Sequence, residues 1–277
     1  MLLRFASLLL LLGATATAPV LAAEPCAHSA PRNLSLDLAG VRSVVFEIGH
    51  NELRLDARAG ASGEISGRAC ASDAGDLERL KLSQRKDGDT LVVRAWREGN
   101  GVSGLFGNRY AELRLAAQVP AHLPVRLEVG SGDAWITGVA SLRFSVGSGD
   151  LDIRGVKEAV QGKVGSGDIE IDRAGSLELG SIGSGDVNAR NIRGDVEVGS
   201  IGSGDFSLDR VGGRVGIGSV GSGDVELSAV AGAIEVGSIG SGDLDVRGAA
   251  SLRVRSIGSG DVSHRDVRGT VDVPRRR

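Results

Sequence analysis

The sequence predicts an all-β protein, a right-handed parallel β-solenoid with two strands in each 18–19-residue rung, preceded by an irregular β-rich lead-in or cap. The first observation behind this prediction is a repeat. The motif Gly-Ser-Gly-Asp occurs eight times, with spacings of 17, 18, 18, 19, 19, 19 and 18 residues. A fixed period near 18 residues suits one solenoid turn of two short strands and two bends. The aspartates that end the motif are Asp133, Asp150, Asp168, Asp186, Asp205, Asp224, Asp243 and Asp261.

Composition gives the second observation. The chain has 43 glycines and only 3% aromatic residues among its 277 residues, so it lacks the bulky side chains of a globular enzyme core. Regularly spaced Val, Ile and Leu in the glycine-rich part argue against disorder. We therefore expect a repetitive structure with a thin aliphatic core, in which β-branched residues fit well.

Apolar residues recur at fixed distances after each repeated aspartate, which gives the third observation. The next residue is apolar in every repeat: Ala134, Leu151, Ile169, Val187, Phe206, Val225, Leu244 and Val262. The third residue on is apolar until the last repeat: Ile136, Ile153, Ile171, Ala189, Leu208, Leu227, Val246 and then His264. The residue between these two is mostly polar, and this period-two alternation predicts a strand with one face in the core. A further apolar column lies six residues on: Val139, Val156, Ala174, Ile192, Val211, Val230, Ala249 and Val267.

The strand before each bend shows a similar alternation, with one insertion in the later repeats. These repeats read Gly-Ser-Ile-Gly-Ser-Gly-Asp or Gly-Ser-Val-Gly-Ser-Gly-Asp, at residues 180–186, 199–205, 218–224 and 237–243. An extra residue at a glycine is typical of a β-bulge. We therefore expect a bulge there that leaves the apolar columns in place.

Charged residues alternate in sign four residues past the aspartates of four successive repeats: Arg154, Asp172, Arg190 and Asp209. Stacked neighbours would then carry opposite charges on the outer face. Each such exposed pair stabilises by well under about 1 kcal/mol, so we expect the stripe mainly to fix the register of the rungs.

The chain divides into four parts. Residues 1–23 have the features of a secretory signal peptide: Arg4, an apolar stretch that is too short to span a membrane, and small residues before a cleavage site. Residues 24–124 alternate less regularly, and we interpret them as a β-rich N-terminal cap or as irregular rungs. Residues 125–273 are the solenoid, and residues 274–277 are a basic tail. We expect an exported protein of the periplasm or cell surface of a bacterium, without a transmembrane segment in the mature chain.

Charge and cysteine content narrow the chemistry. The net charge of −3 argues against nucleic acid as a partner. Because an exported chain meets an oxidising compartment, we expect Cys26 and Cys70 to form a disulfide. The histidines lack the close spacing of a metal site; they are His28, His50, His122 and His264.

One segment and the repeat together resemble a known family. The sequence Val-Pro-Ala-His-Leu-Pro-Val-Arg-Leu-Glu-Val at residues 119–129 leads into Ser-Gly-Asp turns every 18 to 19 residues. With the leader and the β-rich lead-in, this arrangement resembles the bacterial putative-adhesin family of exported β-strand-repeat proteins, related to the head-GIN adhesin-like domains. The resemblance covers about residues 33–273. It implies a right-handed β-solenoid of the cell envelope, in a family defined as a domain of unknown function without established catalytic residues.

The repeated aspartates are the one constellation of chemical interest. Like charges one rung apart, about 4.8 Å, repel by about 1 kcal/mol in a water-like dielectric. In one interpretation, each carboxylate accepts a hydrogen bond from a backbone N–H of its own bend, and the glycines of the motif supply positive φ angles. In the other interpretation, the ladder from Asp133 to Asp261 binds Ca²⁺ through carboxylate and carbonyl oxygens, as in a calcium β-roll. We expect no other metal and no organic cofactor.

Taken together, these features favour a non-enzymatic, adhesin-like binding or scaffold protein of the cell envelope, with no catalytic and no cofactor-binding residues. Its expected partner is an envelope protein or polysaccharide. End-to-end self-association is also open, because solenoid ends expose strand edges. Two alternatives remain: a Ca²⁺-binding β-roll-like protein, and a glycan-active β-helix enzyme. The enzyme would need a groove with two carboxylates about 5 to 9 Å apart.

Overall fold

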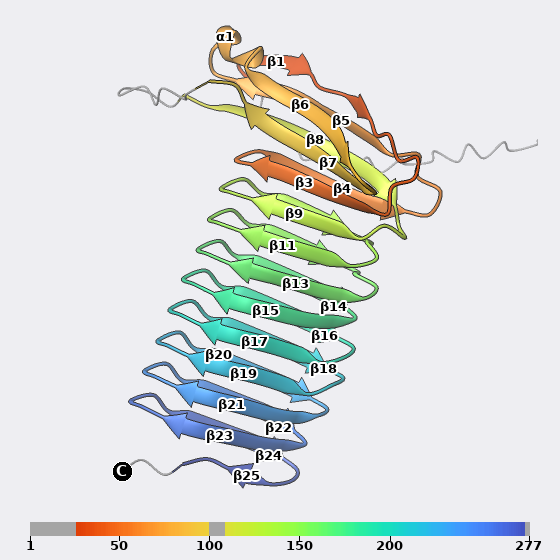
Figure 1. Cartoon of the computed structure of the whole chain (residues 1–277). Coiled ribbons are helices and arrows are strands. Elements are labelled where there is room, and N and C mark those ends of the chain that lie inside the picture. The colour runs from red at the N-terminus through yellow and green to blue at the C-terminus, as the bar shows by residue number, and fades with distance from the viewer. Residues whose placement is uncertain (1–25, 100–108, 275–277) are drawn as a thin grey trace, which may run out of the picture.

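A computed structural model describes residues 26–99 and 109–274, and within them the predicted all-β solenoid is confirmed. Two long sheets face each other along a rod, and one short helix, α1 (Ala74–Leu77), lies at its N-terminal end (Figure 1). Sheet A has, in spatial order, β1 (His28–Pro31), β5 (Glu64–Ala71), β8 (Ala111–Pro120), β4 (Glu52–Arg58), β10 (Ala134–Thr137), β12 (Leu151–Arg154), β14 (Ile169–Ala174), β16 (Val187–Ile192), β18 (Phe206–Val211), β20 (Val225–Val230), β22 (Leu244–Ala249) and β24 (Val262–Val267), with β2 (Leu34–Ser35) beside β5. Sheet B has β6 (Leu80–Asp87), β7 (Thr90–Arg97), β3 (Ser43–Gly49), β9 (Val125–Val129), β11 (Leu142–Val146), β13 (Ala159–Val164), β15 (Ser176–Ile182), β17 (Val196–Ile201), β19 (Val215–Val220), β21 (Ala233–Ile239), β23 (Ser251–Ile257) and β25 (Val271–Asp272).

Each regular rung consists of a strand of sheet B, a Gly-Ser-Gly-Asp turn and a strand of sheet A, beginning with β9 and β10. Strands of neighbouring rungs pair in parallel and in register, so Ala134 on β10 lies beside Leu151 on β12. The three predicted apolar columns therefore lie in the core between the sheets, and they are buried up to the rung of β22. Full burial of one Val, Leu or Ile side chain stabilises by about 1.5–3 kcal/mol. In the last rung, Val262 and Val267 are half-buried and His264 is exposed.

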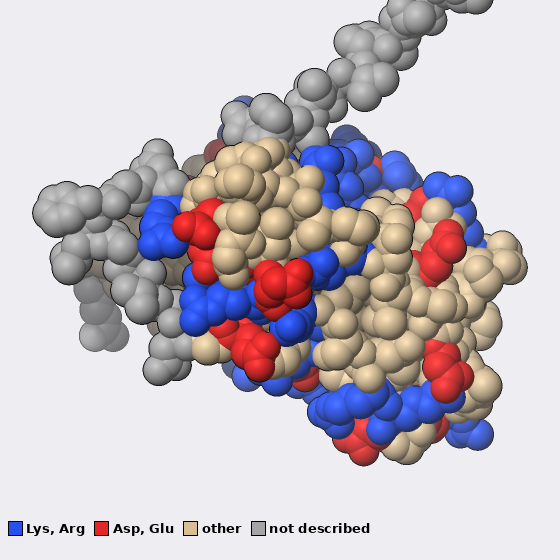
Figure 2. Space-filling model, turned by 90° about the horizontal axis from the view of Figure 1, so that it is seen from above, with Lys and Arg blue, Asp and Glu red and all other residues tan. Residues whose placement is uncertain are grey.

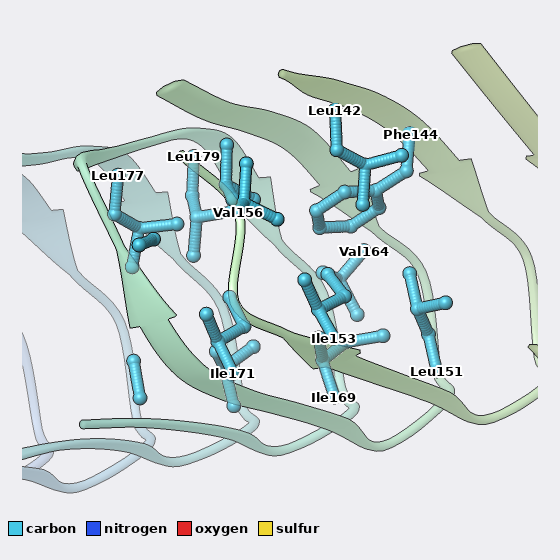
Figure 3. Close-up of a cluster of buried hydrophobic side chains, with 14 of the residues drawn as sticks. Leu142, Phe144, Leu151, Ile153, Val156, Val164, Ile169, Ile171, Leu177 and Leu179 are labelled. Carbon is cyan, nitrogen blue, oxygen red and sulfur yellow. The ribbon is translucent and has the colours of Figure 1, made fainter. Parts of the chain in front are cut away.

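The thin core accommodates an aromatic ring where the next rung has no side chain. Phe144 on β11 is buried and pairs with Gly162 on β13. A Cβ atom at Gly162 would overlap the Phe144 ring, so glycine at this position makes room for it. Figure 3 shows Phe144 in this core with the aliphatic side chains of Ile153, from the opposite sheet, and Val164, from the next strand of its own sheet. At this pair, core packing between neighbouring rungs is therefore matched in side-chain size.

The predicted bulge is confirmed, and its extra residue is Gly180. The pairing of β13 with β15 is regular up to Gly162 and Leu179, and it resumes one residue later on β15 with Lys163 and Ser181. The following rungs all carry the same insertion, so β15, β17, β19 and β21 pair without a further shift. Leu179 and Ile182, on either side of the bulge, are both buried, so the apolar columns continue through it.

The region before residue 125 supplies both irregular rungs and a cap. β3 and β4 form a rung that pairs in parallel with β9 and β10. β7 and β8 form the next rung outward, in parallel with β3 and β4. The β3–β4 rung thus lies between two rungs that follow it in sequence, and the chain passes outward to the cap before it returns to start the regular rungs (Figure 1).

Antiparallel strands close the N-terminal end of the rod. β6 pairs with β7, β5 pairs with β8, and β1 and β2 pair with β5, all antiparallel. Oδ1 of the buried Asp76 in α1 accepts a hydrogen bond from Arg97 at 2.7 Å. Cys26 and Cys70 are joined by a disulfide, with their Cα atoms 5.3 Å apart. Side chains of both charges lie interspersed on this end when it is viewed along the rod (Figure 2). At this end, the described antiparallel strands therefore cover the edge of the outermost parallel rung. Strands of another solenoid could otherwise pair with that edge.

Two sequence predictions fall outside the described residues: the signal peptide at 1–23 and the arginines at 275–277 of the basic tail. Within residues 26–99 and 109–274, no helix has the length and apolar character needed to cross a membrane.

Candidate functional site

The eight repeated aspartates form a ladder of exposed side chains along the edge where sheet B turns into sheet A. Each of the first seven is joined to the backbone of the next rung. Oδ1 of Asp205, for example, accepts a hydrogen bond from the backbone N–H of Asp224 at 2.8 Å. The same contact recurs at all seven steps of the ladder, with distances from 2.8 to 3.3 Å. The aspartate ladder therefore connects every regular rung to its neighbour.

The prediction that each carboxylate bonds within its own bend is wrong. The rungs stack in parallel, and the backbone N–H of each aspartate points back toward the preceding rung. The carboxylate of that rung meets it, because a backbone donor needs a partner where the regular strand pairing stops. Pairing by main-chain groups resumes at the next residue, where the N–H of Phe206 donates to the carbonyl of Asp224 at 2.9 Å.

The prediction that the motif glycines supply positive φ angles is also wrong. The glycines with positive φ in the described residues lie elsewhere, at Gly40, Gly49, Gly60, Gly63, Gly88, Gly99, Gly138, Gly155 and Gly248. The second glycine of each motif is required by close stacking instead. A Cβ atom at Gly204 would overlap the carbonyl oxygen of Gly185 in the preceding turn, and every other rung shows the same close approach. The Gly-Ser-Gly-Asp sequence is thus one that can stack on a copy of itself.

The ladder contributes one carboxylate per rung, and in seven of these the Oδ1 atom already accepts a backbone hydrogen bond. Across the ranges 26–99 and 109–274, no three side chains of the His, Cys, Asp and Glu types gather as a metal site would require. Ca²⁺ usually takes six to eight oxygen ligands. Calcium binding by the ladder stays a prediction.

An additional turn, absent from the sequence prediction, heads the ladder. Gly49 to Glu52 lie in register above the first Gly-Ser-Gly-Asp, since the Gly130 N–H donates to the Gly49 carbonyl at 2.7 Å. Asn51 is fully buried there, and its Nδ2 donates to the carbonyls of Ile48 at 2.7 Å and Ala95 at 3.1 Å. Its Oδ1 accepts the N–H of Leu113 at 2.7 Å. Asn51 therefore joins the turn column to β7 and β8. The available signal was a Gly-x-Asn-acid turn just before the alternating residues of β4.

A second column that was not predicted lies five residues after each ladder aspartate. Every residue of this column is in the left-handed region, with φ between 53° and 83°. Only three of them are glycine, and the column reads Gly138, Gly155, Arg173, Asn191, Arg210, Ala229, Gly248 and Asp266. This conformation costs a non-glycine residue roughly 1–2 kcal/mol, and Asn and Asp tolerate it best. A second bend in each rung was expected, but the mixed composition hid this left-handed column from a search for glycines.

The predicted charge stripe on the outer face of sheet A is confirmed in its register, since Arg154, Asp172, Arg190 and Asp209 pair from rung to rung. Nε of Arg190 lies 3.4 Å from Oδ1 of Asp172. Arg154 instead bonds within its own strand, to Asp152 at 2.8 Å.

Asp172 is the most enclosed member of this stripe, at 9% exposed. A hydrogen bond from Asn191 at 2.7 Å, together with the charges of Arg173 and Arg190, holds the pKa of Asp172 below its usual range, although burial acts in the opposite direction. Asp172 therefore stays ionised and joins two neighbouring rungs.

Both tryptophans lie half-buried under arginine side chains. The Arg54 guanidinium is 4.6 Å from the ring centroid of Trp135, and that of Arg94 is 5.4 Å from the ring of Trp96. Trp135 lies on the outer face of sheet A, in the same outward column as Asp152 and Glu170. Sequence patterns singled out neither pair: Arg54 and Trp135 come from strands far apart in the chain, whereas Arg94 and Trp96 lie two residues apart on β7.

Comparison with known proteins gives matches of structure. No family model and no curated protein matches the sequence. The fold is similar to a crystal structure from Parabacteroides distasonis described as a putative adhesin, with a TM-score of 0.54 and 15% identity, over 86% of this chain and 97% of that chain. A putative adhesin from Parabacteroides merdae matches with a TM-score of 0.48 and 11% identity, over 86% and 96% of the two chains. A putative lipid binding protein from Parabacteroides distasonis matches with a TM-score of 0.49 and 14% identity, over 89% and 97%. At 15% identity, the likeness to the first of these structures is one of fold.

Proposed function

We propose that this chain is an exported, non-enzymatic protein of the bacterial cell envelope, which binds an envelope polysaccharide or protein in the manner of an adhesin. The observation that carries the proposal is the uniformity of the rungs. The same turn, the same apolar columns and short bends recur from β9 to β24, and they leave two long, exposed strand faces. Repeat proteins use extended surfaces of this kind for binding.

The same uniformity argues against a catalytic role. Catalytic groups are disproportionately found on loops that a rigid scaffold positions, and they form a unique arrangement. Here the most regular chemical feature, the aspartate ladder, repeats in every regular rung, and its Oδ1 atoms are used for stacking. The apparent signal peptide supports export, and the fold shared with a protein described as a putative adhesin supports the envelope role.

A deletion strain, compared with its parent and with the complemented deletion strain, tests this function. We expect the deletion to reduce attachment of the cells to a surface or to one another, and we expect the purified protein to capture a component of the envelope fraction. Unchanged attachment together with an empty capture experiment would overturn the proposal. Release of new reducing ends when the protein is incubated with envelope polysaccharide would favour the alternative of a glycan-active enzyme.

A further inference from the structure

The outer face of sheet A contains a shallow hollow of about 200 Å³ over β14, β16, β18, β20 and β22. It arises from the lengths of the outward side chains. Ser207 on β18 lies in register between Asn188 and Glu226, and Ser228 on β20 lies between Asp209 and Arg247. The two serines are short while their neighbours are longer, so the face dips at β18 and β20. The strand segments at Leu208 and Leu227 form part of its lining, and their own side chains are buried in the core.

The small volume and open shape of the hollow suit one unit of a larger ligand better than a whole small molecule. Pockets for whole drug-sized molecules usually measure about 300–1,000 Å³, so this hollow suits a smaller unit. It opens onto a strand face whose outward groups recur about every 4.8 Å along the rod. The column that holds Ser207 continues toward the cap through Glu170 and Asp152 to the indole ring of Trp135. A linear polymer could therefore place one unit in the hollow and its next units along this column.

The charges around the hollow exclude an anionic ligand. Four acidic residues line it against two basic ones: Glu170, Asp209, Glu226 and Asp245 against Arg190 and Arg247. Both guanidinium groups already have carboxylate partners. Arg190 lies 3.4 Å from Asp172, and Arg247 lies 3.1 Å from Asp245. A phosphate or a uronic acid would meet a net negative surface whose lining cations are already engaged.

The hydrogen-bonding groups match a polyhydroxylated ring. The carboxylates accept, and the Asn188 amide both donates and accepts, with one of its N–H groups already on Glu170 at 3.1 Å. The Ser228 hydroxyl donates to Oδ1 of Asp209 at 2.7 Å and can accept from a ligand, while the Ser207 hydroxyl can do either. A sugar carries neighbouring hydroxyls that likewise donate and accept. We propose that this hollow binds one ring of a neutral polysaccharide that runs along the outer face of sheet A. The inference rests on the proposed envelope-binding function and names its ligand class and its site.

Affinity electrophoresis of the purified full chain tests the inference, with a glucan, a mannan or a galactan in the gel and polygalacturonate as the acidic probe. We expect at least one neutral polysaccharide to retard the protein and polygalacturonate to leave its mobility unchanged. Ser207→Gln and Ser228→Gln fill the hollow. Each should raise the dissociation constant obtained from the retardation at least about tenfold. Glu226→Ala removes an exposed acceptor at the same site and provides a variant with little effect on folding.

Ser200→Gln and Ser219→Gln are the matched controls, because they make the same change at half-buried serines on the outer face of sheet B. Their retardation should equal that of the unmodified protein. Retardation of the unmodified protein by none of the three neutral polysaccharides, retardation by polygalacturonate, or unchanged retardation of all three hollow variants would overturn the inference. If the protein still captures an envelope component in that case, the proposed function stands and only the sugar site fails.

Discussion

Oδ1 of Asp205 accepts a hydrogen bond from the backbone N–H of Asp224, one rung further along the rod, at 2.8 Å. The carboxylate takes the place of a main-chain carbonyl where the chain turns from sheet B into sheet A. Repeated at seven steps, this contact makes the aspartate of the motif a stacking residue. The repeat can therefore be explained without a metal ion.

Substitutions at Asp205 should separate the role of the hydrogen bond from that of the charge. Asp205→Asn keeps the Oδ1 acceptor and relieves repulsion from Asp186 and Asp224, so we expect an unchanged or slightly raised free energy of unfolding. Asp205→Ala leaves the Asp224 N–H without its partner and should lower the free energy of unfolding by about 1–2 kcal/mol. Urea denaturation followed by circular dichroism measures both variants. Equal destabilisation by Asn and by Ala would argue against the acceptor role.

Calcium should have little effect on the stability of the solenoid. The ladder offers one carboxylate per rung, and Oδ1 of the first seven already accepts a backbone hydrogen bond, which falls short of the ligand number that Ca²⁺ prefers. We expect melting curves in millimolar Ca²⁺ and in excess chelator to coincide. A ligand present at 100 times its Kd would add about 2.7 kcal/mol to the free energy of unfolding. A clear rise of Tm with Ca²⁺ over chelator would therefore support the β-roll-like alternative.

Gly204 in the turn and Gly180 in the bulge should respond differently to substitution by alanine. At Gly204 a Cβ would overlap the Gly185 carbonyl oxygen, so Gly204→Ala must push two rungs apart. At Gly180, the extra residue of the bulge, the nearest atom would be a side-chain carbon of Lys163 at 3.3 Å, which can move aside. We expect Gly204→Ala to lower the free energy of unfolding by about 3 kcal/mol or more, and Gly180→Ala by less than about 1 kcal/mol. Similar denaturation midpoints for the two variants would contradict the close-stacking explanation.

The left-handed column offers a stabilising substitution. Ala229 has a φ of 53°, and glycine adopts this region without the steric cost of a Cβ atom. Glycine has more conformational entropy than alanine in the unfolded chain, and this offsets part of the gain. We therefore expect Ala229→Gly to raise the free energy of unfolding by a net amount of about 0.5–1 kcal/mol.

The reverse change one rung later, Gly248→Ala, is the control for this prediction. Its nearest neighbouring atoms would be 3.9 Å away, so its cost is conformational rather than steric. The two variants should shift the urea midpoint in opposite directions with an unchanged m value. A shift of Ala229→Gly toward lower stability would show that the column is not strained.

The sequence predicted the rungs well because their causes are local. A strand with one buried face needs a period of two, and stacking of like on like needs a repeat, so the spacing alone places Ala134, Leu151 and their equivalents in one column. The bulge at Gly180 could be found for the same reason, since an inserted residue changes the spacing of the motif.

The missed features depend on which segments become neighbours in space. The β3–β4 rung lies between rungs that come later in the chain, and no local pattern records that order. The Asp205–Asp224 contact depends on the register between rungs, so reasoning within one bend assigned the wrong donor. The hollow at Ser207 and Ser228 likewise depends on the lengths of side chains from several strands.

Binding to the cell envelope is the central claim, and co-sedimentation tests it most directly. Purified protein is mixed at increasing concentrations with envelope fragments from the bacterium that produces it, and the bound fraction is measured after centrifugation. We expect binding that saturates and that excess unlabelled protein displaces. Binding no greater than that of an unrelated acidic protein of similar size, or binding that rises linearly without saturation, would contradict the claim.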